Sequence, residues 1–114
     1  MADKKVVKEL KNSEKYIRIR QDLLDQLERN FTYGEQFKDL VEDYMAFWIT
    51  KTLLIEDINK RGVNVKYNNG GGQSGYKKND SIGELNKTNA QMLKLLSELG
   101  IKATVADSGD DDDL

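Results

Sequence analysis

The 114-residue sequence contains no cysteine, no histidine and no proline. Without cysteine and histidine it has no disulfide, no thiolate or imidazole ligand for zinc, no thiol nucleophile and no histidine general base. Most familiar catalytic machinery is therefore missing, and we expect a protein that is not an enzyme, with no cofactor and no metal. The lack of proline favours long uninterrupted helices, because no ring removes an amide donor or clashes with the preceding turn.

Long apolar runs are also missing. The longest, residues 44–49, is far shorter than the roughly 20 residues that a membrane-spanning helix needs. The first residues, Met-Ala-Asp-Lys-Lys, are followed by no apolar segment of the kind that marks a secretory signal. We therefore expect a cytosolic protein made of one domain with a modest core.

The formal net charge of −2 averages over regions of opposite sign. Residues 103–114 contain five aspartates and no basic residue, which leaves 18 basic against 15 acidic residues elsewhere, a net charge of +3. We expect residues 1–12 to form a basic arm, partly helical at best, and residues 103–114 to form a disordered acidic tail. The acidic total therefore does not exclude an anionic partner.

Two helices are predicted in the first half of the chain. Asn12 or Ser13 is a suitable N-cap for the first, whose apolar stripe ends near Asn30. The second is expected over residues 33–61, with Gly62 as the cap that ends it. This second helix is far longer than an average helix and dominates the predicted fold.

A third helix is predicted after residue 80. Ser81 and Glu84 have the spacing of a capping box, in which the serine bonds an orphan amide and the glutamate reaches back. Gly100 and Ile101 fit a Schellman motif that closes the helix. Between these ends, apolar side chains recur at helical spacing: Leu85, Met92, Leu96 and Leu99.

The second helix carries more apolar surface than one neighbour covers. At about 100° per residue, its apolar side chains span about half of the circumference, wider than the usual stripe of roughly 100°. The surplus implies contact with the third helix, with another subunit, or with both. Trp48 is more often a core residue, although aromatics and Met are also enriched at interfaces. The residues that we expect at an oligomer interface are Leu40, Phe47, Trp48, Leu54, Ile58 and Met92.

A cationic stretch separates the second and third helices. Residues 60–79 contain five basic residues, no acidic residue and many glycines and asparagines. Val63, Val65 and Tyr67 alternate with polar residues, which allows a short strand or a hairpin. Cationic, flexible backbone with tyrosines is suited to follow phosphates and to lay a ring against a sugar or base, while the alternative is a solvated surface loop. The predicted DNA-binding residues are Lys4, Lys5, Lys8, Lys11, Lys60, Arg61, Lys66, Tyr67, Tyr76, Lys77 and Lys78.

Three other sequence patterns are weaker evidence of function. Residues 70–75 satisfy G-x-G-x-x-G, but they lack the strand and helix of a βαβ unit, so we do not expect dinucleotide binding. A P-loop fails because Tyr76 stands where its lysine is required. Four carboxylates of the second helix allow a metal site, a solvated face or a contact with a basic surface of another subunit. They are Glu35, Asp39, Glu42 and Asp43.

The order of three stretches resembles the phage terminase small subunits. Residues 39–48 read Asp-Leu-Val-Glu-Asp-Tyr-Met-Ala-Phe-Trp, and residues 68–81 read Asn-Asn-Gly-Gly-Gly-Gln-Ser-Gly-Tyr-Lys-Lys-Asn-Asp-Ser. Residues 84–100 read Glu-Leu-Asn-Lys-Thr-Asn-Ala-Gln-Met-Leu-Lys-Leu-Leu-Ser-Glu-Leu-Gly. The resemblance covers roughly residues 10–103 and consists of a long helix, a polar excursion and a helix that ends in Leu-Gly.

The resemblance implies a non-enzymatic, ring-forming component of the genome-packaging motor, which acts in the host cytoplasm. Such a subunit binds double-stranded viral DNA and recruits or regulates a large subunit that holds the ATPase and the nuclease. The chain is then expected to be an all-α subunit of three helices with an extended polar loop. Residues 13–102 are then expected to form the helical domain for oligomerisation and DNA binding.

Two alternatives stay open at this point. One is a small dimeric transcriptional regulator, and the other is a protein-binding adaptor that uses the acidic tail. The sequence shows no separate helix-turn-helix domain, because the second helix is too long and too apolar to be an ordinary recognition helix. How DNA would be contacted therefore depends on the structure.

Overall fold

Four helices and one two-stranded hairpin make up residues 4–102, the part of the chain that this computed structural model describes. The elements are α1 (Lys4–Lys11), α2 (Glu14–Arg29), α3 (Glu35–Arg61), β1 (Asn64–Gly70), β2 (Gln73–Lys78) and α4 (Asp80–Glu98). The prediction of a mostly helical subunit with one long central helix is confirmed. The predicted three helices are corrected to four in this region, because part of the basic arm is itself a helix. The predicted acidic tail lies outside the described residues.

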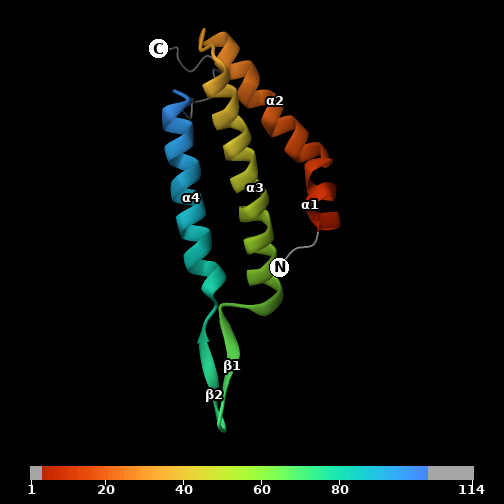
Figure 1. The fold of residues 1–114 in the computed structure, drawn as a ribbon, viewed down its shortest axis with the longest axis vertical. Helices are drawn as coiled ribbons and strands as arrows, with labels where there is room; N and C mark the ends of the chain where they lie inside the picture. Colours follow the sequence, from red (N-terminus) through yellow and green to blue (C-terminus); the bar gives the residue numbers. More distant parts are fainter. Residues whose placement is uncertain (1–3, 103–114) are drawn as a thin grey trace, which may run out of the picture.

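The long helix α3 is the axis of the molecule (Figure 1). α4 packs against α3 along its length and runs antiparallel to it, while α2 and α1 lie on the other side of α3. The hairpin joins the adjacent ends of α3 and α4 and projects beyond them. The molecule as a whole is 64 Å long and 37 × 24 Å across. No helix within residues 4–102 is both long and apolar enough to cross a membrane.

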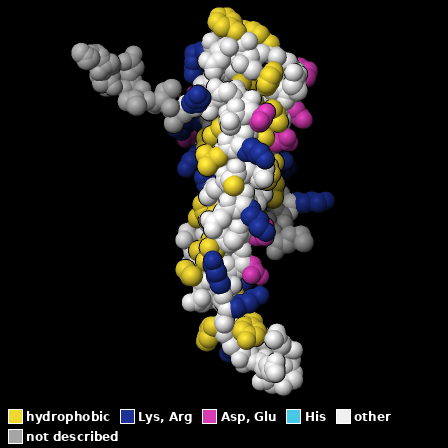
Figure 2. Space-filling view, turned by 90° about the vertical axis from the view of Figure 1, so that its left-hand side faces the viewer, with side chains coloured by type: hydrophobic (Ala, Val, Ile, Leu, Met, Phe, Trp, Pro, Cys, Tyr) yellow, Lys and Arg dark blue, Asp and Glu magenta, His cyan; other side chains and the backbone are white. Residues whose placement is uncertain are grey.

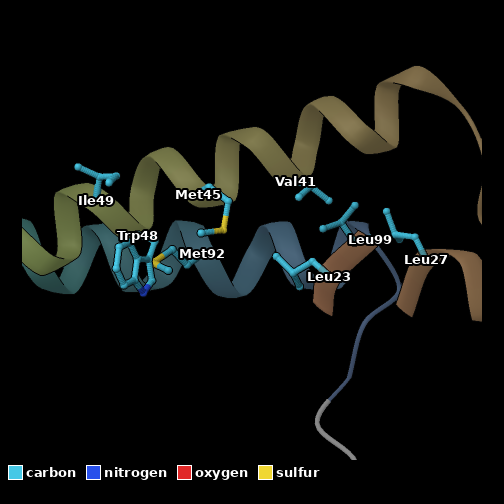
Figure 3. Close-up of a cluster of buried hydrophobic side chains, with 8 residues drawn as sticks. All are labelled: Leu23, Leu27, Val41, Met45, Trp48, Ile49, Met92 and Leu99. Carbon is cyan, nitrogen blue, oxygen red and sulfur yellow. The ribbon is translucent and has the colours of Figure 1, made fainter. Parts of the chain in front are cut away.

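The core lies where α2, α3 and α4 meet (Figure 3). Four of its side chains come from α3, at the spacing of one helical face, two come from α2 and one comes from α4. The eighth, Leu99, is the residue that follows α4 as its C-cap. Burial between two neighbours explains why the apolar arc of α3 is wider than one partner requires. The core residues are Leu23, Leu27, Val41, Met45, Trp48, Ile49, Met92 and Leu99.

The predicted helix ends are largely confirmed. Ser13 caps α2, since its Oγ accepts a hydrogen bond from Tyr16 N–H at 3.3 Å. Gly62 ends α3 with φ of 89°. Gly100 N–H and Ile101 N–H donate to the carbonyls near the end of α4 at 3.0 and 2.9 Å, which is the Schellman pattern.

The start of α4 differs from the prediction. Asn79, rather than Ser81, is the N-cap, because its side chain accepts the hydrogen bond from Ser81 N–H. The capping box with Glu84 was therefore wrong. The Ser81 hydroxyl instead donates to Asp57 on α3, a tertiary contact that sequence spacing does not reveal.

Candidate nucleic-acid interface

The cationic stretch between α3 and α4 folds into an antiparallel hairpin. Pairing runs from Asn64 opposite Lys78 to Gly70 opposite Gln73, with an irregularity after Asn68. The possibility of a hairpin, which the alternation of apolar and polar residues allowed, is confirmed. The stretch is therefore a defined projection from the helical body (Figure 1).

Three consecutive glycines reverse the chain at the tip. Gly70, Gly71 and Gly72 have φ of 77°, 55° and 81°, a region that residues with a Cβ rarely adopt. The Asn68 side chain accepts a hydrogen bond from Gly70 N–H at 2.8 Å and supports the turn. These glycines of the G-x-G-x-x-G pattern thus serve the geometry of a tight reversal.

The hairpin has two chemically different faces. Side chains alternate along a strand, and directly opposite residues share a face. Lys66 is opposite Tyr76, whereas Val65 is opposite Lys77. We call the first side the cationic face and the second the Val65 face. The cationic face comprises Asn64, Lys66, Asn68, Ser74, Tyr76 and Lys78.

The two tyrosines of the hairpin differ in their freedom to meet a ligand. Tyr67, on the Val65 face, lies against Gly75 and is partly buried. A Cβ atom on residue 75 would lie 3.1 Å from Tyr67 Oη, so the ring occupies the space that a larger residue would need. Tyr76, on the cationic face, is 75% exposed. Of the two predicted ring contacts, Tyr76 is the accessible one.

A buried asparagine holds the base of the hairpin. Asn79 is completely buried, and its Oδ1 accepts hydrogen bonds from Ser81 N–H at 2.9 Å and from Arg61 at 3.2 Å. Its Nδ2 donates to the Gly62 carbonyl at 2.9 Å and to the Asp57 carboxylate at 3.2 Å. Every polar atom of this buried side chain is paired, as a stable interior requires.

Asp57 is the second centre of this network. Its carboxylate accepts two hydrogen bonds from Arg61, at 2.7 and 2.9 Å, and one from the Ser81 hydroxyl at 2.7 Å. The bonds from Arg61, followed by that from Ser81, hold the pKa of Asp57 well below its ordinary value. We call the four side chains Asp57, Arg61, Asn79 and Ser81 the junction. The junction joins the last turn of α3 to the first turn of α4, on either side of the hairpin.

The predicted DNA-binding cations fall into two groups. Arg61 is engaged at the junction, and Lys77 Nζ lies 3.4 Å from Asp80 Oδ2. The remaining cations of this region form no ion pair with acidic groups of residues 4–102. These unpaired side chains, Lys60, Lys66 and Lys78, retain their full charge for a partner.

The predicted basic arm contributes a second cationic surface. Within α1, Lys4, Lys8 and Lys11 are spaced for one helical face, and they line a shallow depression with Val7. These lysines and Lys5 form no ion pair with the acidic groups that the structure describes. Figure 2, which views the molecule from the α4 side and not from the α1 side, shows Lys and Arg side chains interspersed with acidic and apolar ones along the body, and no charged side chain at the tip of the hairpin.

The side chains predicted at an oligomer interface are not equally accessible. Trp48 and Met92 are 9% and 4% exposed and belong to the core of the single chain. Leu40, Phe47, Leu54 and Ile58 are all partly buried, but only Leu40 and Phe47 pack against that core, whereas Leu54 and Ile58 lie near the end of α3. The predicted interface stays a prediction, and these last two residues are its most available members.

The four carboxylates of α3 do not converge. Glu42 accepts a hydrogen bond from Arg20 Nε on α2 at 2.8 Å, and Glu35 lies 3.7 Å from Lys38. Within residues 4–102 no group of three or more acidic side chains is arranged to hold a metal ion. At least Glu42 thus serves to hold α2 against α3.

Two structural features were missed in the sequence. Asn79 precedes a helix start and has the residue type of an N-cap, a signal that the nearby Ser81 obscured. Phe31 adopts φ of 57° after α2 and is 81% exposed, although glycine is the usual residue in this conformation. No sequence pattern pointed to Phe31.

Comparison with protein families gives one finding. The family model described as phage terminase, small subunit, matches residues 17–104. No curated protein and no solved structure matches the chain. The matched segment contains α3, the hairpin and α4 whole, together with most of α2.

Proposed function

Because the chain belongs to the phage terminase small-subunit family, we propose that it is the DNA-recognising subunit of a viral genome-packaging motor. It binds double-stranded viral DNA as a homo-oligomeric ring and recruits or regulates the large subunit that carries the ATPase and the nuclease. The observation that carries the DNA-binding part is the set of unpaired lysines on α1 and around the hairpin. The packaging role rests on the membership of the chain in the family.

Electrostatics supports a polyanionic ligand. The stretch of residues 60–79 has no acidic residue, and three of its five cations form no ion pair with the acidic groups of residues 4–102. One such surface is weak by itself, but a ring repeats it around an axis and multiplies the field that a phosphate backbone meets. Binding should therefore be strongly salt-dependent and weakly selective for sequence.

Assembly is supported by apolar surface that a single chain leaves uncovered. Leu54 and Ile58 are partly exposed, and Ile55 is 39% exposed, all on the hairpin-proximal half of α3. A second copy that covers this region would place several hairpins side by side at one end of the assembly. Light scattering of the full chain measures its molar mass directly. A mass of several protomers supports the ring, whereas a monomer or a dimer contradicts it, and a dimer with a palindromic footprint would identify a transcriptional regulator.

DNA binding is tested by the anisotropy of a labelled duplex between 50 and 200 mM salt. If the protein neutralises about six phosphates, affinity should fall by roughly three orders of magnitude over this range. Replacing Lys66, Lys77 and Lys78 with Gln should weaken binding and flatten the salt slope. A matched control replaces Lys51, Lys87 and Lys94, which lie outside the predicted site. Equal behaviour of the two variants would contradict the hairpin assignment, and no binding by the unaltered protein would contradict the proposed function.

A further inference from the structure

We propose that the hairpin enters the major groove of duplex DNA as a two-stranded ribbon, with the cationic face toward the DNA. The inference rests on the proposed DNA-binding function and adds which surface binds and which groove receives it. It is carried by the shape of the hairpin, by the order of chemical groups along it and by the difference between its two faces.

The dimensions of the hairpin fit the groove. Paired strands lie about 4.8 Å apart, and a groove about 12 Å wide and 8.5 Å deep admits a two-stranded ribbon. The seven residues of β1 span about 20 Å, and they project from the helical body (Figure 1). The tip can thus reach the floor of the groove while the helices stay outside the duplex.

Chemical groups along the hairpin follow the order of groups in the groove. Phosphates line the rim of a groove, and the hydrogen-bonding edges of the bases line its floor. Residues 68–74, around the tip, are uncharged and include two asparagines, a glutamine and a serine. Lys66 lies four residues before Gly70, about 13 Å along the strand. With the tip at the floor of a groove about 8.5 Å deep, Lys66 and the opposite Tyr76 stand about 4–5 Å above the rim, from where a lysine side chain can reach the phosphates.

The two faces differ in the charge that they offer. Lys66 and Lys78 lie on the cationic face and form no ion pair with acidic groups of the described chain. Lys77 lies on the Val65 face, where Asp80 offsets its charge. Tyr76 is exposed on the cationic face, whereas Tyr67 is held against Gly75 on the other. Both differences favour the cationic face as the one in contact with DNA.

The junction keeps the ribbon in position. Asn79 N–H donates to the Val63 carbonyl at 2.7 Å, which pairs the two strands at their base in addition to the side-chain bonds of Asp57 and Asn79. A ribbon that is ordered before binding loses little conformational entropy on entering a groove. The hairpin is therefore an ordered structure before DNA binds and not a flexible loop.

A matched pair of single substitutions tests the face. Lys66→Gln and Lys77→Gln remove the same charge from opposite faces of neighbouring positions in the paired strands of the hairpin. Lys66→Gln should lower the affinity for duplex DNA about tenfold or more and reduce the salt slope by about 0.9 for each hairpin that contacts the duplex, the value for one lost phosphate contact. Lys77→Gln should leave affinity within about twofold. Equal losses would overturn the face assignment while leaving DNA binding intact.

A second experiment tests the groove. Methyl green occupies the major groove and netropsin the minor groove, so their ability to displace the unaltered protein from a duplex separates the two routes. Displacement by methyl green alone is expected. Displacement by netropsin alone, or by neither ligand, would overturn entry into the major groove. An unaltered protein that binds no duplex at all would instead contradict the proposed function.

Discussion

The helical body and the hairpin are stabilised by different forces. In the body, seven apolar side chains from α2, α3 and α4 are buried together with Leu99, the C-cap of α4. The hairpin buries no side chain of its own strands fully, and it depends on its backbone ladder and on the polar junction at its base. The helical body therefore contributes most of the free energy that stabilises the fold, because burial of apolar surface is the dominant favourable contribution to folding. The hairpin is left free to carry charge and uncharged polar groups that a core would exclude.

The largest expected effect that sharpens this comparison is in the core. Met45 is completely buried on α3, and Met45→Ala should lower the free energy of unfolding by about 2–5 kcal/mol. Urea denaturation followed by circular dichroism measures this loss. The matched hairpin substitution Lys66→Ala should change the same quantity by less than about 0.5 kcal/mol, since its side chain is exposed. Similar losses in the two variants would show that the division into body and hairpin is wrong.

A smaller and more local effect is expected at the junction. Asn79→Ala removes four side-chain hydrogen bonds and leaves Gly62 O and Asp57 without one partner each. The hairpin should then sample a wider range of directions while α3 and α4 stay folded. Because the chain has no cysteine, Thr50→Cys and Ser74→Cys place two spin labels without interference.

The distance distribution between these labels, measured in protein diluted with unlabelled chain, reports the direction of the hairpin. A narrow distribution is expected with Asn79 and a broad one with Asn79→Ala. Lys87→Ala, which alters an exposed ion pair elsewhere on α4, is the control and should leave the width unchanged. An equally narrow distribution in Asn79→Ala would show that the strands alone set the direction of the hairpin.

The same distance distribution should depend on pH through Asp57. The pKa of this carboxyl is lowered below its ordinary 3.8 in the folded chain, mainly by the bonds from Arg61. Its stabilising contribution is therefore fully present above about pH 4, and it is lost as the pH falls below that value. We expect the distribution to broaden between pH 4 and pH 2. Asp57→Asn should be broad already at pH 6 and change less over this range.

The smallest expected effect is on the Val65 face. Gly75→Ala brings a Cβ atom to about 3 Å from Tyr67 and displaces the ring. The chemical shifts of the Tyr67 ring should change, and the free energy of unfolding should change by less than about 1 kcal/mol, because the site lies outside the core. Affinity for DNA should stay within about twofold if the cationic face is the binding surface. A large loss of affinity would instead assign binding to the Val65 face.

Much of the body was predictable from the sequence. The cap at Asn12 or Ser13 with the apolar stripe that follows placed α2, and the apolar spacing around Trp48 with the glycines at 62 and 100 helped to place α3 and α4, each to within a few residues. Helix periodicity and capping are local, so a single sequence records them. The short α1 was expected to be partly helical at best, because eight residues are too few to form a stable helix alone and rely on packing against α2 and α3.

The candidate site was predictable in its composition and not in its geometry. The sequence identified the cationic, glycine-rich stretch and allowed a hairpin, but it treated its cations as equivalent. Register separates them, since it sets Lys66 and Lys77 on opposite faces. Arg61 was assigned to DNA, yet it bonds to Asp57 one turn earlier on α3, at a helical spacing that the sequence already contains. Its bond to Asn79 forms only when α4 folds back along α3.

By itself, the sequence determined the helices, the charge of the excursion and the absence of thiol and imidazole chemistry, because these depend on residue type and on neighbours within a few positions. The tertiary structure alone decided that Trp48 and Met92 meet inside one chain and that Asn79 joins both ends of the hairpin. Those outcomes depend on pairs of residues that lie from 17 to 44 positions apart in the chain. Only the return of α4 along α3, driven by burial of their apolar faces, brings these pairs together.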